Sequence, residues 1–214
     1  SRAMGARRWG ATTAAFAVMA ATSAGTAWSG GRVDPGAMSL REKVGQLVMF
    51  APRGTALTQT ERDVMRGQDI GGVILFAQNY DNRTQLAALT EQIQRVVRSG
   101  TPHRIGALIS VDQEGGVVKR FPDMPPWRSA PEIGDTGSTS AAFDEGRATG
   151  RALRRAGVNI NLAPVADLDL PPEHVMRSRS FGSAPRGNRS DSIRAFSRRI
   201  SRCRSSTAGS TRRC

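Results

Sequence analysis

Residues 107–121 read Ala-Leu-Ile-Ser-Val-Asp-Gln-Glu-Gly-Gly-Val-Val-Lys-Arg-Phe, and this stretch decides the fold. A short apolar run, residues 107–111, ends abruptly in Asp112, Gln113 and Glu114, and two glycines follow. The pattern predicts a buried strand that delivers these polar side chains to a tight turn at its carboxyl end. In a barrel of parallel strands, ligands bind at the carboxyl ends of the strands, so this position favours a site. The alternative is a plain strand followed by a polar turn.

The segments on either side alternate between helix-like and strand-like patterns. Ser39 and Glu42 form a capping-box pair that opens a short helix. We expect the buried face of that helix to contain Val44, Leu47 and Val48. Further strands are predicted at residues 47–50, 71–76 and 158–162, and further helices at residues 58–66, from an Asp81 cap to Ser99-Gly100, at residues 140–156, and from a Ser190 cap through Ile193, Phe196 and Ile200.

Strands that alternate with helices predict a parallel sheet joined by right-handed crossovers. A closed eight-stranded barrel usually needs about 250 residues, whereas the organised stretch here is residues 39–200 and contains roughly four strand–helix units. The expected fold class is therefore α/β, a partial (β/α)8 TIM barrel that comprises about its first half.

The N-terminal segment, residues 1–30, differs in composition from the rest. Residues 4–27 begin with a basic Met-Gly-Ala-Arg-Arg, continue through a modest Ala- and Thr-rich apolar stretch, and end in small residues. This order is typical of a secretory signal peptide, which predicts a secreted or cell-envelope protein. The apolar part is too short to predict a stable membrane span after export. The alternative is a disordered N-terminal extension.

The formal net charge of +13 is concentrated in the C-terminal tail. Residues 177–214 carry 11 arginines and one acidic residue, so the preceding residues are nearly balanced. Residues 201–214 also lack apolar periodicity and hold both cysteines, Cys203 and Cys214. We interpret this segment as out-of-frame translation of GC-rich DNA, with a genuine basic tail as the alternative. Because the tail has no stacking aromatic residue after Phe196 and no groove-reading fold around it, no nucleic-acid partner is predicted.

Several motifs, in order, resemble the N-terminal domain of glycoside hydrolase family 3, especially its bacterial β-N-acetylhexosaminidase branch. They are Leu40-Arg-Glu-Lys-Val-Gly-Gln-Leu-Val, Gly71-Gly-Val-Ile-Leu-Phe, Asp112-Gln-Glu-Gly-Gly with Arg120-Phe121, Gly157-Val-Asn-Ile-Asn-Leu-Ala-Pro-Val-Ala-Asp and Arg179-Ser-Phe-Gly. The resemblance covers about residues 39–200. It implies a (β/α)8 barrel that removes terminal β-linked sugars with retention of configuration, without a cofactor or metal.

The resemblance also implies which catalytic groups to look for. The family's nucleophile is an aspartate on a later strand, and this branch uses a His–Asp pair on a mobile loop as acid/base, after a Lys-His-(Phe/Ser)-Pro-Gly-His-Gly motif. Neither element is present in this sequence, so no catalytic residue is assigned and the chain is expected to be a truncated member. His103 and His174 stand in other contexts and are interpreted as surface or turn residues.

Three substrate-binding residues follow from the resemblance: Asp112, Arg120 and Arg179. Asp112 matches an aspartate that accepts hydrogen bonds from sugar hydroxyls, and the two arginines match donors to the sugar. A carboxylate and a guanidinium fork suit vicinal hydroxyls. The alternative for each arginine is a solvated charge or an ion pair with Asp112 or Asp167. Gln113 and Glu114 are expected to be structural, and Val117 replaces an arginine that is common in the family.

The resulting hypothesis is a β-N-acetylhexosaminidase-like glycoside hydrolase that acts on terminal β-linked N-acetylglucosamine-type sugars, in carbohydrate metabolism or cell-wall recycling. A carbohydrate is the expected partner, and the oligomeric state is left open. A non-hydrolytic sugar-binding module and an inactive fragment remain as alternatives, because the expected site binds a sugar without providing catalytic groups.

Overall fold

The computed structural model describes residues 33–169, 176–182 and 193–197. The Ser190 cap, Ile200, His174, the N-terminal segment 1–30 and the tail 201–214 therefore lie outside the described residues. None of the helices in the described ranges combines the length and the apolar character needed to cross a bilayer. The elements are, in chain order, η1 (Pro35–Ala37), α1 (Leu40–Gly45), β1 (Met49–Phe50), α2 (Gln59–Gly67), β2 (Gly72–Leu75), η2 (Ala77–Asn79), α3 (Arg83–Gly100), β3 (Leu108–Val111), β4 (Gln113–Gly115), β5 (Val118–Lys119), α4 (Ala130–Asp135), α5 (Thr139–Arg155) and β6 (Ile160–Asn161).

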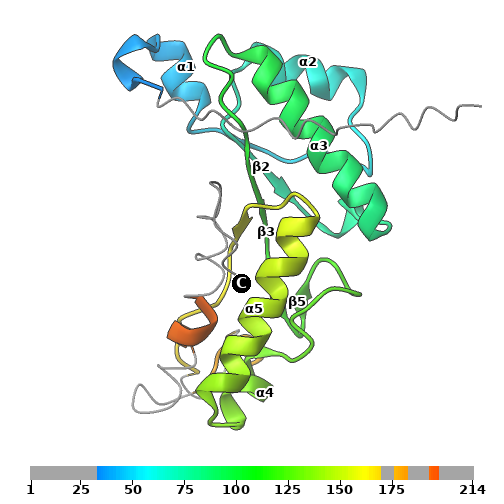
Figure 1. Cartoon of the computed structure of the whole chain (residues 1–214), viewed down its shortest axis with the longest axis vertical. Helices are drawn as coiled ribbons and strands as arrows, with labels where there is room; N and C mark the ends of the chain where they lie inside the picture. Colours follow the sequence, from blue (N-terminus) through cyan, green and yellow to red (C-terminus); the bar gives the residue numbers. More distant parts are fainter. Residues whose placement is uncertain (1–32, 170–175, 183–192, 198–214) are drawn as a thin grey trace, which may run out of the picture. The chain divides into compact units, whose positions relative to one another are not determined.

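Strands β1, β2, β3 and β6 form a four-stranded parallel sheet in that order, which confirms the predicted parallel arrangement. Val73 of β2 is in register with Ile109 of β3, and Ser110 of β3 is in register with Ile160 of β6. Because the four paired strands are parallel, all of them end at the same edge of the sheet (Figure 1). Asp112 directly follows β3 at this edge.

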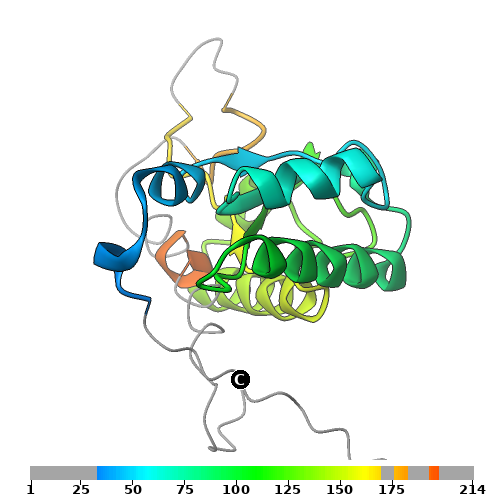
Figure 2. The ribbon, with the colours of Figure 1, turned by 90° about the horizontal axis from the view of Figure 1, so that it is seen from above.

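The main hydrophobic core lies between this sheet and helices α2, α3 and α5, of which α2 and α3 pack side by side (Figure 2). The apolar positions of α3 recur at 3–4 spacing, so one face of the helix is continuous and buried, as predicted. Alternate residues of a strand lie on opposite faces of the sheet. The residues of β2 and β3 on the face opposite to the exposed Leu108 complete the core. The buried core residues of α3, β2 and β3 are Leu86, Leu89, Ile93, Val96, Val97, Val73, Leu75, Ile109 and Val111.

Helix starts follow the expected capping chemistry, with one correction. The Ser39 hydroxyl accepts a hydrogen bond from the Glu42 amide at 3.2 Å, and the Glu42 carboxylate accepts one from the Ser39 amide at 2.7 Å. For α3, the predicted Asp81 cap is wrong, because Asn82 is the cap and its side chain accepts from the Gln85 amide at 3.0 Å. Asn and Asp serve equally well as caps, so sequence alone did not separate these neighbours.

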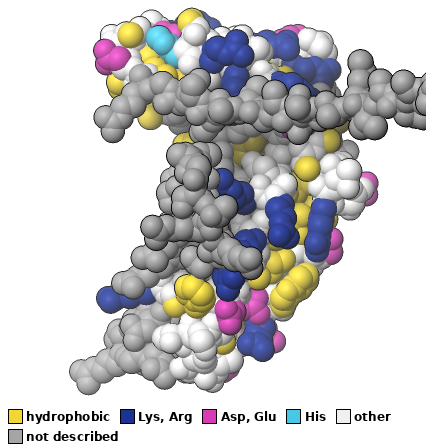
Figure 3. Space-filling view, viewed as in Figure 1, with side chains coloured by type: hydrophobic (Ala, Val, Ile, Leu, Met, Phe, Trp, Pro, Cys, Tyr) yellow, Lys and Arg dark blue, Asp and Glu magenta, His cyan; other side chains and the backbone are white. Residues whose placement is uncertain are grey.

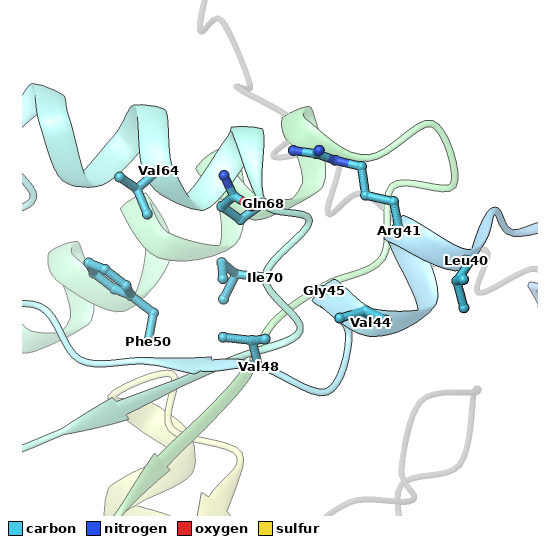
Figure 4. Close-up of a pocket in the computed structure, with 9 residues that line it drawn as sticks. All are labelled: Leu40, Arg41, Val44, Gly45, Val48, Phe50, Val64, Gln68 and Ile70. Atoms are coloured by element: carbon cyan, nitrogen blue, oxygen red, sulfur yellow. The ribbon is translucent and has the colours of Figure 1, made fainter.

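The predicted buried face of the first helix is also wrong. Val44, Leu47 and Val48 are all exposed, and the exposed fraction of Leu47 is 86%. Helix α1 ends at Gly45, so Leu47 and Val48 lie beyond it, and β1 pairs with β2 alone among the described strands. Val44 and Val48 line an apolar groove between α1, β1 and α2 (Figure 4).

A β-hairpin and a short helix near the sheet edge were not predicted. Strands β4 and β5 form a two-stranded antiparallel hairpin directly after β3. Helix α4 follows, and its Ile133 belongs to a second buried cluster together with Phe181 and Phe196. Residues 193–197 are helical, in agreement with the predicted last helix. On the face shown in Figure 3, Lys and Arg side chains run along α5 with hydrophobic side chains between them.

Candidate functional site

The turn after β3 requires its two glycines. Gly115 and Gly116 both have positive φ, +96° and +58°, a region that other residues rarely adopt. A Cβ on Gly115 would lie 2.6 Å from the Arg128 carbonyl oxygen, and one on Gly116 would lie 2.8 Å from Cβ of Ser129. The hairpin can therefore fold back tightly, which brings Arg120 close to Asp112.

Asp112 and Arg120 meet at the carboxyl end of β3, as the sequence predicted for the same site. Nη2 of Arg120 lies 3.4 Å from Oδ2 of Asp112, so the ion-pair alternative is realised as a long contact. The guanidinium also lies 5.7 Å from the ring centre of Phe76, within the range of a cation–π interaction. Nε of Arg120 is buried and has no hydrogen-bond partner among the described residues. The side chain is 31% exposed, so the terminal N–H groups of the guanidinium, and not the buried Nε, are the donors that a ligand can reach.

Gln113 is fully buried and organises the hairpin through its side-chain amide. Its Oε1 accepts hydrogen bonds from the backbone amides of Arg120 and Phe121, both at 3.0 Å. Its Nε2 donates to the carbonyl oxygens of Phe121 at 2.9 Å and Pro125 at 3.2 Å. One amide therefore satisfies donors and acceptors on both sides of the loop, which confirms the structural role expected for Gln113.

Glu114 points to the third candidate residue, Arg179. Nε of Arg179 lies 2.9 Å from Oε2 of Glu114, and Nη2 lies 2.5 Å from Oε1. The Glu114 side chain is 4% exposed and that of Arg179 is 30% exposed. This hydrogen bonding raises the pKa of Arg179, against the effect of burial, with further contributions from the charges of Asp112 and Asp167. The predicted alternative partners of Arg179, Asp112 and Asp167, are therefore wrong, because the bidentate geometry is made with Glu114.

The segment that carries Arg179 is held in place by its own backbone and by α4. The Ser180 hydroxyl donates to the Asp167 carbonyl oxygen at 2.6 Å, and the Phe181 ring is buried in the second cluster. A Cβ on Gly134 of α4 would lie 2.0 Å from the Phe181 carbonyl oxygen, so a glycine is needed for this close approach. The position of Arg179 thus depends on packing that joins residues far apart in the sequence.

Asparagines of the 157–167 motif were not predicted to take part. The Asn161 side chain accepts from the Gln113 amide at 3.0 Å and donates to the Gln113 carbonyl oxygen at 3.1 Å. Asn159 makes the same pair of bonds to β3, with Ile109 and Ala107. The repeated Asn at alternate positions was the available signal, since residues two apart in a strand share a face. Their amides hold β6 against β3 and fix the backbone next to Asp112.

The two remaining predictions concern His103 and Val117, which lie outside this group. His103 lies in a turn, and its Nε2 is 3.7 Å from Oε1 of Glu42, away from the carboxyl end of the sheet. Val117 is exposed at the hairpin turn. Within the described ranges, no group of three or more His, Cys, Asp or Glu side chains is arranged to hold a metal ion.

The comparison with known families agrees with this geometry. The model of the glycosyl hydrolase family 3 N terminal domain matches residues 39–189, which is more than half of the chain. The chain belongs to glycosyl hydrolase family 3. Asp112, Arg120 and Arg179 all lie inside the matched range.

Two β-hexosaminidases are similar to this chain in sequence. The β-hexosaminidase of Bordetella avium is 38% identical over 147 residues, which cover 65% of this chain and 40% of that protein. The β-hexosaminidase of Nitrosomonas eutropha is 39% identical over 145 residues, which cover 64% and 40%. The chain thus spans well under half the length of these relatives.

Solved structures of family 3 enzymes match the fold. NagZ from Neisseria gonorrhoeae in complex with N-trifluoroacetyl-D-glucosamine aligns with a TM-score of 0.64 and 30% identity, over 72% of this chain and 46% of that chain. A family 3 β-N-acetylglucosaminidase from Paenibacillus aligns with a TM-score of 0.69 and 29% identity, over 76% and 32%. The fold is therefore a partial (β/α)8 barrel, as predicted.

Proposed function

We propose that this chain provides the sugar-binding part of a glycoside hydrolase that removes terminal β-linked N-acetylglucosamine-type sugars. The observation that carries this proposal is the convergence of Asp112, Arg120 and the Glu114–Arg179 pair at the carboxyl end of β3. Ligands of parallel α/β barrels bind at this end. The names of the relatives and the sugar bound by the gonococcal NagZ support the sugar class.

Each of the three residues has a distinct role in the proposal. The carboxylate of Asp112 accepts hydrogen bonds from one or two sugar hydroxyls. Arg120 donates from the terminal N–H groups of its partly exposed guanidinium, which the long contact with Asp112 does not saturate. Arg179 donates from the side of its guanidinium that faces away from Glu114. Charge-assisted bonds of this kind are stronger than neutral ones and fix the orientation of the sugar.

The described carboxylates near the site do not suit bond cleavage. Retaining glycosidases need one carboxyl group as nucleophile and one group as acid/base, about 5–5.5 Å apart when both are carboxyl groups. Glu114 is buried and both of its oxygens accept from Arg179, so it has no access to a glycosidic oxygen. Asp112 is placed to bind hydroxyls. This favours, as a second candidate, a chain that binds the sugar without hydrolysing it.

Nitrophenol release from an aryl β-N-acetylglucosaminide tests whether the chain hydrolyses the sugar as well as binding it. We expect the chain to release no nitrophenol above background, because Glu114 is held by Arg179 and Asp112 is paired with Arg120. Turnover that Asp112→Ala abolishes would contradict this assignment and would place the whole reaction within the chain. A complete family 3 β-N-acetylglucosaminidase serves as the positive control.

We also propose export to the cell envelope or the exterior, on the basis of the basic start, apolar stretch and small residues of the N-terminal segment. Expression with a C-terminal tag in a bacterial host tests this proposal. Recovery of a shortened chain outside the cytoplasm supports it. An unshortened chain confined to the cytoplasm would contradict it.

A further inference from the structure

The ion pair of Glu114 with Arg179 has features that an ordinary surface ion pair lacks. Both carboxylate oxygens are used, the distances are 2.9 and 2.5 Å, and the Glu114 side chain is almost entirely buried. A planar guanidinium bound bidentately through Nε and Nη2 cannot rotate without breaking both bonds. The plane of Arg179 is therefore fixed before any ligand arrives.

The remaining donors of Arg179 define the direction in which a ligand is bound. Nε and one N–H of Nη2 are taken by Glu114, which leaves the Nη1 side of the fork for another acceptor. This side chain is 30% exposed, so that acceptor can reach it. The orientation of the donors is thus set by Glu114.

The charges around Arg179 also limit which acceptor is favoured. Glu114 cancels the charge of Arg179, and Asp112 faces Arg120 at 3.4 Å. The hydrogen bond and charge of Glu114 raise the pKa of Arg179 against the effect of burial, and the charges of Asp112 and Asp167 add to this rise. Three carboxylates therefore act on Arg179, and Asp112 also pairs with Arg120. An incoming phosphate or carboxylate would meet an excess of negative charge, whereas a hydroxyl or an amide oxygen would not.

We infer that Glu114 is a positioning residue that orients Arg179 for sugar binding and cancels its charge, so that the site selects uncharged sugars over anionic ones. This inference rests on the proposed function and adds the basis of its ligand selectivity. Glu114 acts through Arg179 and does not itself touch the sugar.

A double-mutant cycle with two ligands tests the inference. Titrations of the full chain with N-acetylglucosamine and with inorganic phosphate are compared for wild type, Glu114→Gln, Arg179→Ala and the double variant. We expect Glu114→Gln to weaken sugar binding about tenfold and the double variant to bind no more weakly than Arg179→Ala, because the residues act as one unit. Phosphate should bind Glu114→Gln about tenfold more tightly than wild type, since the guanidinium charge is no longer cancelled.

Glu91→Gln is the matched control, because it breaks the exposed ion pair with Arg95 on α3, far from the sheet edge in sequence. It should change neither affinity. Unchanged sugar affinity in Glu114→Gln, or losses that add in the double variant, would overturn the inference. A merely structural role for Glu114 would lower stability without any gain in phosphate binding, and that result would overturn it as well.

Failure of the proposed function gives a different pattern. If wild type does not bind N-acetylglucosamine but Glu114→Gln gains phosphate binding, the charge cancellation is supported and the sugar proposal is contradicted. If neither occurs, both are overturned. Should Glu114→Gln not fold, Glu114→Asp replaces it, since it keeps the charge and shortens the side chain. Weaker sugar binding without a gain in phosphate binding then supports the inference, and unchanged sugar binding overturns it.

Discussion

Nη2 of Arg120 and Oδ2 of Asp112 face each other at 3.4 Å across the tight hairpin that follows β3. The pair is long for a charge-assisted hydrogen bond, and both side chains are partly exposed. A partly exposed pair of this kind contributes only about 0–1 kcal/mol to the free energy of unfolding. The pair therefore adds little to the stability of the fold.

Arg120→Ala is expected to separate a role in ligand binding from a role in stability. The affinity for N-acetylglucosamine should fall about tenfold or more, because charge-assisted donors to the sugar are lost. The free energy of unfolding should change by less than about 1 kcal/mol. Calorimetric titration and denaturant unfolding measure the two quantities, with Arg95→Ala on α3 as the control for loss of an exposed ion pair. A large loss of stability with unchanged affinity would assign Arg120 to the fold instead.

Gln113→Leu, in contrast, is expected to lower the free energy of unfolding. The substitution removes the hydrogen bonds to the backbone of Arg120, Phe121 and Pro125 while keeping a buried side chain. Buried backbone groups left without partners cost about 1–3 kcal/mol each, so we expect a loss of at least about 2 kcal/mol. Urea unfolding measures it, with the exposed Gln59→Leu as the control. A loss no larger than that of the control would mean that the loop does not depend on this amide.

The strands and the long helices could be predicted from the sequence because local patterns determine them. The apolar runs of β2 and β3 are bounded by glycines or polar residues, and α3 repeats its apolar positions at helical spacing. The position of Asp112 at a strand end followed directly from such a run. Helix α4 also had a local signal, Ser129 and Glu132 at capping-box spacing with Pro131 between them, which its short length concealed.

The remainder depended on contacts that no local pattern reveals. Glu114 and Arg179 are 65 residues apart in the sequence. From the sequence alone, Asp112 or Asp167 could have formed the ion pair with Arg179 equally well. Their pairing follows from Gly134, which lets the Phe181 backbone approach α4. The exposure of Val44 and Leu47 likewise depends on the tertiary packing around the edge strand β1. The spacing of hydrophobic residues along the sequence does not specify that packing.

The alkaline titration of Tyr80 tests the packing of the loop after β5. Burial and a hydrogen bond to the Asp123 carboxylate raise the pKa of Tyr80 from 10.0 to about 12. Because the folded-state pKa is the higher one, protonated Tyr80 contributes stability that is fully present below pH 10.0 and is lost as the pH rises towards about 12.

Tyr80 is the only tyrosine in the sequence, so the near-ultraviolet absorbance of phenolate reports this residue alone. We expect a midpoint of about 12 in the wild type and a lower one in Asp123→Asn, in which the carboxylate charge is removed. Asp81→Asn, at a nearby exposed carboxylate, should leave the midpoint unchanged. A wild-type midpoint near 10.0 would show that the loop does not hold Tyr80 against Asp123.

Gly134→Ala tests whether the packing of α4 positions Arg179. The new Cβ would lie 2.0 Å from the Phe181 carbonyl oxygen, so the segment 179–181 must move. We expect a destabilisation of about 2–3 kcal/mol together with weaker sugar binding. Gly67→Ala is the matched control, because nothing lies within 4 Å of its Cβ, and it should be neutral or slightly stabilising. Equal effects of the two substitutions would contradict the close approach of Phe181.

The central claim is that Asp112, Arg120 and the oriented Arg179 form one site for an N-acetylglucosamine-type sugar. The most direct measurement is a calorimetric titration of the full chain with N-acetylglucosamine, repeated on Asp112→Ala. We expect saturable binding by the wild type that Asp112→Ala removes, while the thermal midpoint of unfolding stays nearly the same. Binding that Asp112→Ala leaves intact, or no saturable binding by a folded wild-type chain, would contradict it.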